Sequence, residues 1–311
     1  KSAIESGSYR IDDKAIAGFW EPILQSSGDD ELYAKLHPKI SGRSVTEFLV
    51  FQTDNANSIL SSVIQARENA RMVRDQVTVE LWEELNRIYL FLRSKQARQL
   101  WRENPADFFL AIRNSSLLLQ GLTDATIVRN EGWFFIQCGR YLERADKTSR
   151  LLDVRHESVP ARGSPPAALS QTDALGWSAV LRSCSAWDAY KALHGAEVQP
   201  ALVAEFLLLS DEFPRSVRFS VNHLNDALRR ISGVAAGRFS NDAEKLAGRL
   251  LAELQFSTAD DIFDIGLHTY IDVVQAKLNA IGDALFQAYI FQPFQTLEEH
   301  ELHQQEEQQQ Q

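Results

Sequence analysis

Apolar residues recur at intervals of three and four positions along most of this chain, and that spacing is typical of amphipathic helices. We find no convincing alternating run of five or more residues that would indicate a β-strand. Four to five of the periodic segments are longer than about 15 residues. The pattern predicts an all-α fold, a multi-helix bundle of roughly nine to eleven helices with no significant sheet.

Polar residues and prolines indicate where these helices begin and end. The predicted starts are Ser44 with Glu47 as a capping box, Asn57 or Ser58, Asn104 before Pro105, Glu131, and Asp211 with Pro214 in its first turn. Later helices are expected at 173–193, around 200–209, and at 241–256 and 259–291. The proline- and glycine-containing stretch at 157–171 predicts a loop, and residues 233–237 predict a break.

The length of 311 residues and the hydrophobic fraction of 44% are enough for a large buried core. We predict one helical domain over residues 1–293. Residues 294–311 are rich in Glu and Gln and are expected to form a disordered tail.

The formal net charge is −10, and leaving out the five glutamates after Thr296 reduces it to −5. Such a mildly acidic chain is not expected to bind nucleic acid or anionic membrane surfaces. The longest apolar runs, such as IYLFL, are too short to span a membrane, and no signal peptide is evident. Cys138 and Cys184 form no disulfide framework and are expected to be buried thiols, so the sequence predicts a cytoplasmic protein.

Charged residues crowd one helix in the stretch GRYLERADKTSRLLDVR, residues 139–155. On a helical wheel the expected core face comprises Phe134, Cys138, Tyr141, Ala145, Thr148 and Leu152. A separate ridge carries Arg140, Arg144 and Lys147, with Glu143, Asp146 and Arg150 beside it. Two of these pairs have the favourable i,i+4 order with the acid first, so the cluster can be explained as a solvated helix face.

A second basic ridge lies upstream, where Arg67, Arg71 and Arg74 stack at i, i+4 and i+7 beside Glu68. Three arginines on one ridge repel unless they meet carboxylates or an anionic ligand. The simpler explanation is pairing with acids that follow in the sequence, namely Asp75, Glu80, Glu83 or Glu84. If the two ridges face each other across the bundle, they would form an arginine-rich cleft suited to carboxylates or phosphates.

The stretch GRYLERADKTSRLLDV closely resembles the alpha-E family, which is named for its Glu-Arg motif. Further resemblance lies in NANSILSSVIQARENARMVRD, LWEELNR, LLLQGLTDATIVRNEGWFFIQCGR, VAEFLLLSDEFPRSVRF, AGRLLAEL and KLNAIGDALF, and it covers roughly residues 19–290. The resemblance implies an all-helical bacterial protein encoded beside, or fused to, a circularly permuted ATP-grasp protein. Transglutaminase-like proteases are implied as neighbours. The implied role is in a peptide-modification system whose ATP-grasp partner forms an amide bond through an acyl-phosphate.

The resemblance also implies which residues form a site. These are Arg140, Glu143, Arg144, Asp146 and Arg150 of the motif, with Arg67, Glu68, Asn69, Arg71 and Arg74 upstream, and Asn86 and Arg215 as further candidates. One departure is that members usually begin with a helix carrying an earlier Tyr-x-x-Glu-Arg-Ala motif, which Lys1–Arg10 does not show. We therefore expect the family's N-terminal helix to be missing from this sequence.

The sequence has no phosphate-binding glycine loop, no Rossmann fingerprint and no G-x-S-x-G motif. No cofactor is expected on this chain, and ATP and Mg²⁺ would belong to the ATP-grasp partner. Asp261, Asp264, His268 and Asp272 have the spacing of one helical face, but no paired Glu-x-x-His motif accompanies them. His300 and His303 lack the spacing of a zinc-protease motif, so no metal site is expected.

Three hypotheses follow for the function. In the first, the protein is a non-catalytic or co-catalytic partner whose Arg/Glu cleft binds the ATP-grasp protein, an acyl-phosphate intermediate, or an acidic peptide or amino-acid substrate. In the second, it is an enzyme that forms or cleaves amides with Glu143 as general base. In the third, Glu143 and Arg144 form a buried pair that only holds helices in register.

Overall fold

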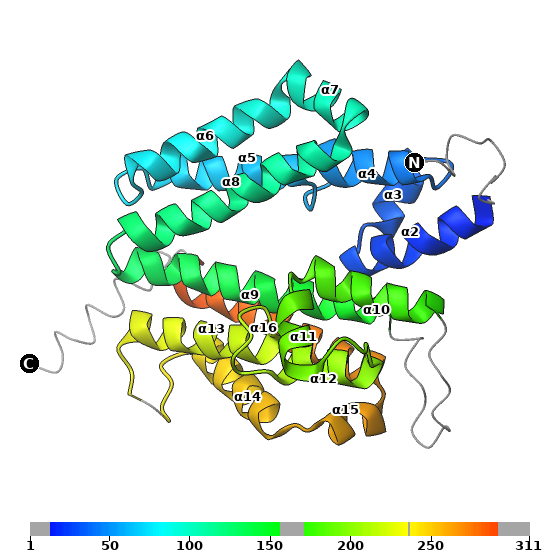
Figure 1. Cartoon of the computed structure of the whole chain (residues 1–311). Coiled ribbons are helices and arrows are strands. Elements are labelled where there is room, and N and C mark those ends of the chain that lie inside the picture. The colour runs from blue at the N-terminus through cyan, green and yellow to red at the C-terminus, as the bar shows by residue number, and fades with distance from the viewer. Residues whose placement is uncertain (1–12, 156–170, 236, 292–311) are drawn as a thin grey trace, which may run out of the picture. The chain divides into compact units, whose positions relative to one another are not determined.

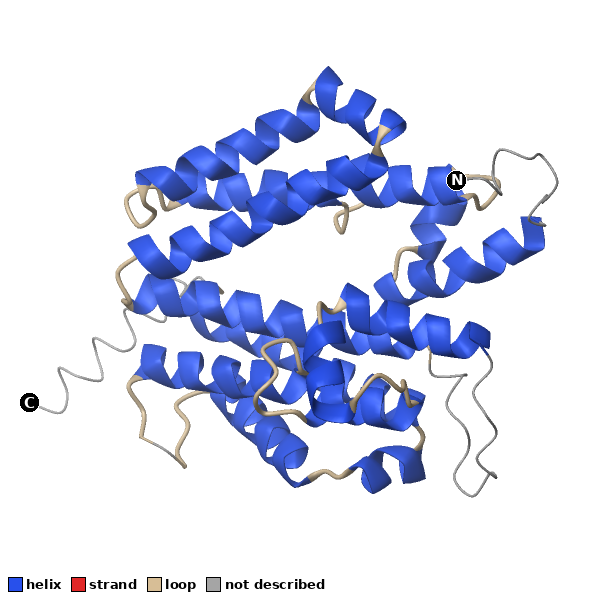
Figure 2. Cartoon of the chain, viewed as in Figure 1, coloured by secondary structure: helices blue, strands red, loops and turns tan. Residues whose placement is uncertain are grey.

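The computed structural model describes residues 13–155, 171–235 and 237–291. These ranges contain fifteen helices. Figure 2 shows them joined by loops, with no strand among the described residues. The prediction of an all-α fold is confirmed. The helix number exceeds the expected nine to eleven because short helices such as α3 (Asp30–Leu36) and α7 (Lys95–Glu103) lie between longer ones, and because two predicted helices are each divided in two.

Contacts divide the chain into two compact units. Unit 1 comprises residues 1–136 and 150–158. Besides α3 and α7 it contains α2 (Asp13–Ser27), α4 (Gly42–Phe51), α5 (Ile59–Met72), α6 (Val79–Arg93) and α8 (Pro105–Thr126). Helix α6 packs against α5 and α8, and α7 packs against α8 (Figure 1). The core between these helices is formed by aromatic and branched side chains, including Phe51, Trp101 and Phe108.

Unit 2 comprises residues 137–149 and 159–311. Its first segment is the middle of α9 (Glu131–Asp153), whose two ends belong to unit 1. The other helices are α10 (Gln171–Ser183), α11 (Trp187–His194), α12 (Pro200–Leu209), α13 (Val217–Ser232), α14 (Asp242–Phe256), α15 (Ala259–Ile265) and α16 (Leu267–Tyr289). Helix α14 packs against both α13 and α16 (Figure 1). Trp177, Leu181 and Leu224 are fully buried in this unit.

Several predicted helix starts are confirmed. Ser58 caps α5, and Asn104 caps α8 with Pro105 in its first turn. Helix α4, however, begins earlier than predicted, because Ser41 is its N-cap and Ser44 is the third helical residue. The two serines form a reciprocal capping box, so Ser44 takes the place that the prediction had assigned to Glu47.

Two long predicted helices are broken in the structure. The one expected at 173–193 ends at Ser183 and resumes at Trp187, with Ser185 at a positive φ of 52° between them. The one expected at 259–291 is interrupted at Gly266, whose φ of 94° is a left-handed conformation that glycine adopts without steric cost. A glycine inside an apolar period is compatible with a continuous helix, so the pattern alone did not reveal this break.

None of the helices in the described ranges combines the length and the apolar composition that a bilayer crossing requires. Several predictions lie outside those ranges, namely the N-terminal motif, nearly all of the loop at 157–171, the Glu/Gln tail, and His300 with His303. The assignment of residues 1–293 to one domain stays a prediction.

Candidate functional site

Helix α9 buries the face that its periodicity predicted. Cys138, Ala145, Thr148 and Leu152 are almost wholly shielded from solvent. Tyr141 on the same face is partly buried. The charged motif residues therefore project from the remaining sides of a helix whose inner face is fixed by packing.

Helix α9 is held to the loop formed by residues 210–216, which lies before α13 in the same unit. The Nη1 atom of Arg144 donates a hydrogen bond of 3.0 Å to the carbonyl oxygen of Pro214. The hydroxyl of Thr148 donates one of 2.9 Å to the carbonyl of Arg215. The loop's backbone thus provides the acceptors, and the motif arginine contributes to the tertiary structure.

This 210–216 loop replaces the predicted start of α13. Asp211 was expected to cap the helix and Pro214 to lie in its first turn, but α13 begins at Val217 with Ser216 as its cap. The Ser216 hydroxyl accepts from the Phe219 N–H at 3.0 Å and donates to the carbonyl of Ser210. The cap therefore leaves the carbonyls of Pro214 and Arg215 available to α9.

Three aromatic rings form a group beside the Arg144 side chain, which contacts the first of them, Tyr141. The Arg144 guanidinium lies 5.3 Å from the centre of the Tyr141 ring, and the Tyr141 ring stacks on His223 at 4.9 Å. Phe219 meets His223 edge-on at 4.2 Å. Burial, together with the positive charge of Arg144, lowers the pKa of His223 below its ordinary 6.5, against the opposing influence of Asp226.

We expect His223→Phe to reduce the loss of stability in mild acid. Below about pH 6.5 the unfolded chain takes up a proton at His223 before the folded chain does. The His223 contribution is therefore fully present above that pH and is lost as the pH falls toward the folded pKa. Phenylalanine keeps the aromatic contacts and removes the titration. Urea unfolding at pH 7.5 and pH 5 would show a smaller decrease for the variant, and an equal decrease in both proteins would contradict the assignment.

The acidic residue of the motif is in solvent. The Glu143 side chain is 71% exposed and pairs with Lys147 at 3.6 Å. Lys147 also bonds Asp146 at 3.1 Å. Glu143 is therefore not the buried partner of Arg144 that the structural hypothesis required. The predicted i,i+4 pair between Glu143 and Lys147 is confirmed.

Two further motif arginines have separate contacts. Arg140 donates a 3.0 Å hydrogen bond to the side-chain oxygen of Gln137, one turn earlier in α9. Arg150 belongs to unit 1 and donates from Nη1 to the carbonyl of Ser26 at 2.7 Å, at the end of α2. Both of these acceptors are neutral groups.

In unit 1, the upstream ridge forms a connected group that we call the α5–α6 arginine cluster: Arg67, Glu68, Arg71 and Asn86. Arg67 donates to Asn86 at 2.7 Å and to Glu68 at 2.7 Å. Arg71 donates to the second Glu68 oxygen at 2.8 Å. The hydrogen bond from Arg71, with the charges of both arginines, lowers the pKa of Glu68.

Sequence reasoning missed the aromatic residues of this cluster. The Arg67 guanidinium lies 4.7 Å from the centre of the Tyr89 ring and 5.4 Å from that of Trp82. The Trp82 ring also lies 5.4 Å from Arg74, which donates to the carbonyl of Val77. The signal was present, because Trp82, Asn86 and Tyr89 follow i, i+4 and i+7 on one helix face.

The prediction that this ridge pairs with the acids that follow it in the sequence is wrong. Among the described residues, Arg67 and Arg71 pair with Glu68 of their own helix and not with the acids that follow. Glu84 instead forms a bidentate pair with Arg87. Asn69 is exposed on α5, and no hydrogen bond of its side chain is found in the described ranges.

The site residues thus divide between the two units. Arg140, Glu143, Arg144, Asp146 and Arg215 belong to unit 2, whereas the α5–α6 arginine cluster, Asn69, Arg74 and Arg150 belong to unit 1. A cleft formed by both ridges stays a prediction.

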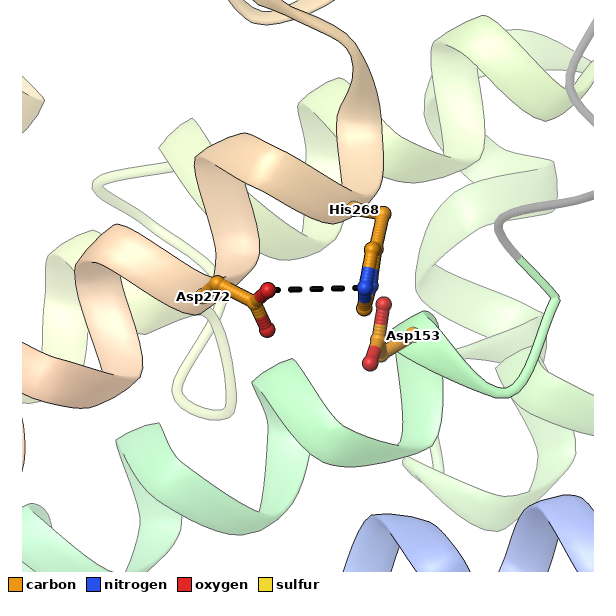
Figure 3. Close-up of side chains that lie close together, drawn as sticks. All are labelled: Asp153, His268 and Asp272. Atoms are coloured by element: carbon orange, nitrogen blue, oxygen red, sulfur yellow. Dashed lines mark ion pairs between the residues drawn. The ribbon is translucent and has the colours of Figure 1, made fainter.

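The acidic residues around His268 do not share one helical face as their spacing suggested. Gly266 separates α15 from α16, so Asp261 and His268 lie on different helices. Asp261 belongs to the capping box of α15 with Thr258. His268 pairs with Asp272 of α16 at 3.4 Å. Figure 3 marks this ion pair with a dashed line.

Both cysteines are buried and free, as expected. Burial raises the pKa of Cys138 to about 12 and that of Cys184 to about 11, although the charge of Arg215 opposes the shift at Cys184. Neither thiol is therefore available as a thiolate nucleophile at neutral pH.

Similarity to known proteins identifies the family of this chain but gives little information about its function. A protein of Mycobacterium bovis and two of Mycobacterium tuberculosis, each described as uncharacterized, are 22% identical over 250 residues. The match covers 76% of this chain but only 27% of each relative, so the chain spans about a quarter of their length. No solved structure matches the chain.

A family model described as a predicted alpha-helical domain with a conserved ER motif matches residues 4–290. The match includes both units. The sequence contains one Glu-Arg dipeptide, Glu143–Arg144, which lies in the stretch LERAD on α9. With essentially the whole chain matched, this protein belongs to the Alpha-E family.

Proposed function

We propose that this protein is the helical partner component of a cytoplasmic, ATP-grasp-linked system that forms amide bonds on peptides or amino acids. It holds an acidic partner surface or substrate on its arginines. The observation that carries this proposal is the α5–α6 arginine cluster, in which Arg67 and Arg71 share one acid, Glu68, and two aromatic rings lie against Arg67.

The α5–α6 arginine cluster is suited to binding anions because its parts are already ordered. Asn86 and two rings hold Arg67, while the Arg71 side chain is 63% exposed. Guanidinium groups bind carboxylates and phosphates through paired hydrogen bonds, and a fixed guanidinium loses little entropy on binding.

The environment of Glu143 favours a binding role over catalysis by this chain. A carboxylate general base is usually tuned by apolar surroundings or a like charge. Glu143 instead lies in solvent beside the ammonium group of Lys147. We accordingly assign the chemistry, with ATP and Mg²⁺, to the circularly permuted ATP-grasp partner, and a transglutaminase-like protease is a second candidate partner.

The Mycobacterium relatives support an association with other protein parts. They carry the matching region within much longer chains, since it makes up 27% of each. A region that is joined to other segments in relatives can act beside a separate partner here.

The test is direct binding to a purified circularly permuted ATP-grasp protein from the same organism. We expect Arg67→Gln/Arg71→Gln to weaken binding at least tenfold, because charge-assisted hydrogen bonds contribute about 1.5–3 kcal/mol each. Biolayer interferometry with the full chain would measure the dissociation constant.

Arg113→Gln is the matched control, since Arg113 is exposed on α8 and makes none of the cluster contacts. It should bind like the unmodified protein. Equal affinity of the folded double variant and the control would contradict the proposal. Amide formation by the isolated chain that is lost in Glu143→Gln would favour the enzymatic hypothesis instead.

A further inference from the structure

A separate pocket lies in unit 1, between α4, α7 and the start of α8. Its volume is about 360 Å³, and its walls are formed by Arg43, Thr46, Trp101, Arg102, Pro105 and Phe109. This volume lies within the range of small-molecule sites, roughly 300–1,000 Å³. None of these six residues belongs to the α5–α6 arginine cluster or to the α9 motif.

One part of the pocket wall is apolar and firmly placed. The Trp101 side chain is buried in the core of unit 1, where it meets Phe51 edge-on at 5.6 Å. Pro105 is the first residue of α8, and Phe109 follows one turn later. Phe109 is 40% exposed, so an apolar ligand could cover surface that now faces solvent.

The other part of the wall carries two positive charges. Arg43 is in the first turn of α4, and Arg102 is in the last turn of α7. Within the described ranges, neither arginine has an ion pair. The neighbouring acids have other partners: Glu47 with Arg98 at 3.7 Å, Glu103 with Gln99 at 3.0 Å and Asp107 with Asn104 at 2.6 Å.

The two positive charges of this pocket can be neutralised by an anionic ligand. Two guanidinium groups in one pocket repel each other unless an anion lies between them. The α4 N-terminus adds to the positive potential, since its first turn holds no acidic residue to offset the helix dipole. The Thr46 hydroxyl already donates to the carbonyl of Gly42 at 2.6 Å, so the two arginines are the charged donors that the pocket offers to an anion.

From the combination of unpaired guanidinium groups and an aromatic wall in one cavity, we propose that this pocket binds a small carboxylate with an aromatic or branched apolar body. The carboxylate bonds Arg43 and Arg102, and the apolar body lies against Trp101 and Phe109. This site goes beyond the proposed function, because it lies apart from the residues assigned to partner binding.

The test uses three probes in isothermal titration calorimetry with the full chain: N-acetyl-phenylalanine, its neutral amide, and inorganic phosphate. We expect the acid to bind and the other two to bind at least tenfold more weakly, since one lacks the charge and the other the apolar body. Equal binding of acid and amide, stronger binding of phosphate, or no binding of the acid would each overturn the proposal.

Substitutions of the two pocket arginines test whether the acid binds in this pocket. Arg43→Gln and Arg102→Gln should each weaken binding of the acid about tenfold or more, which corresponds to loss of one charge-assisted contact. Arg230→Gln removes an equal charge from an exposed position on α13 and should leave binding unchanged. Folding of every variant is checked by circular dichroism, and unaltered affinity in both folded pocket variants would overturn the assignment.

Discussion

Arg87→Met should destabilise unit 1 by about 3 kcal/mol, the lower end of the range for breaking a buried ion pair. Arg87 reaches both oxygens of Glu84 at 2.6 Å and also donates to Ser115 at 2.7 Å. The Glu84 side chain is only 6% exposed, whereas Arg87 is 59% exposed. Methionine keeps most of the stem but leaves a carboxylate without its cation. Urea unfolding monitored by circular dichroism would measure the loss.

Arg71→Met is a matched comparison, because Arg71 and Glu68 also form an i,i+3 pair on a helix. The Glu68 side chain is 41% exposed, so this change should cost less than about 1 kcal/mol. Adding Glu84→Gln to Arg87→Met should recover part of the lost stability, since it removes the stranded charge. A double variant as unstable as Arg87→Met would show that the charge is not the cause.

Ser216→Ala should destabilise unit 2 by about 2 kcal/mol, because the hydroxyl serves two backbone groups at once. It accepts from the Phe219 N–H and donates to the Ser210 carbonyl, and the residue is 0% exposed. Alanine removes the helix cap and leaves the carbonyl of the 210–216 loop unsatisfied. Chemical denaturation would show this as a lower transition midpoint with an unchanged slope.

A double-mutant cycle tests whether this loop and α9 act together. If Ser216 shapes the loop that Arg144 binds, Arg144→Gln should cost less in the Ser216→Ala background than in the unmodified protein. Thr258→Ala is the control, since Thr258 is the exposed cap of α15 and lies far in sequence from Arg144 and Ser216. Its effect should add to that of Arg144→Gln. Strict additivity of Ser216→Ala with Arg144→Gln would disprove the coupling.

The contact between α9 and the 210–216 loop joins two stretches that both belong to the resemblance to the family. The Glu-Arg stretch provides Arg144 and Thr148, and the EFPRS stretch provides the carbonyl groups that they bind. The arginine of the motif thus has a structural role, while its neighbour Glu143 remains accessible on the surface. The two adjacent residues therefore differ in environment, since Arg144 bonds another segment of the chain and Glu143 lies in solvent.

Much of the local structure was predictable because it depends on residues close in sequence. The 3.6-residue period correctly predicted the buried face of α9, including Cys138 and Ala145. Caps such as Asn104 were recognisable because the cap side chain bonds an N–H three residues away. The i,i+4 pair of Glu143 and Lys147 follows from the same geometry.

The tertiary structure decided the features that depend on distant contacts. Thr148 bonds a carbonyl that lies 67 residues away, and nothing in the local pattern indicates that partner. Both Ser and Asp can cap a helix, so the sequence did not decide between Ser216 and Asp211 as the cap of α13. The packing of the loop decided it in favour of Ser216. Sequence alone thus determined the all-helical fold and the buried face of α9, because these arise from periodicity and short-range hydrogen bonds, but it missed the breaks at Ser185 and Gly266. Only the tertiary structure decided which charged side chains bond to other segments and which lie in solvent. That choice depends on which backbone groups are brought close to each side chain when the helices pack.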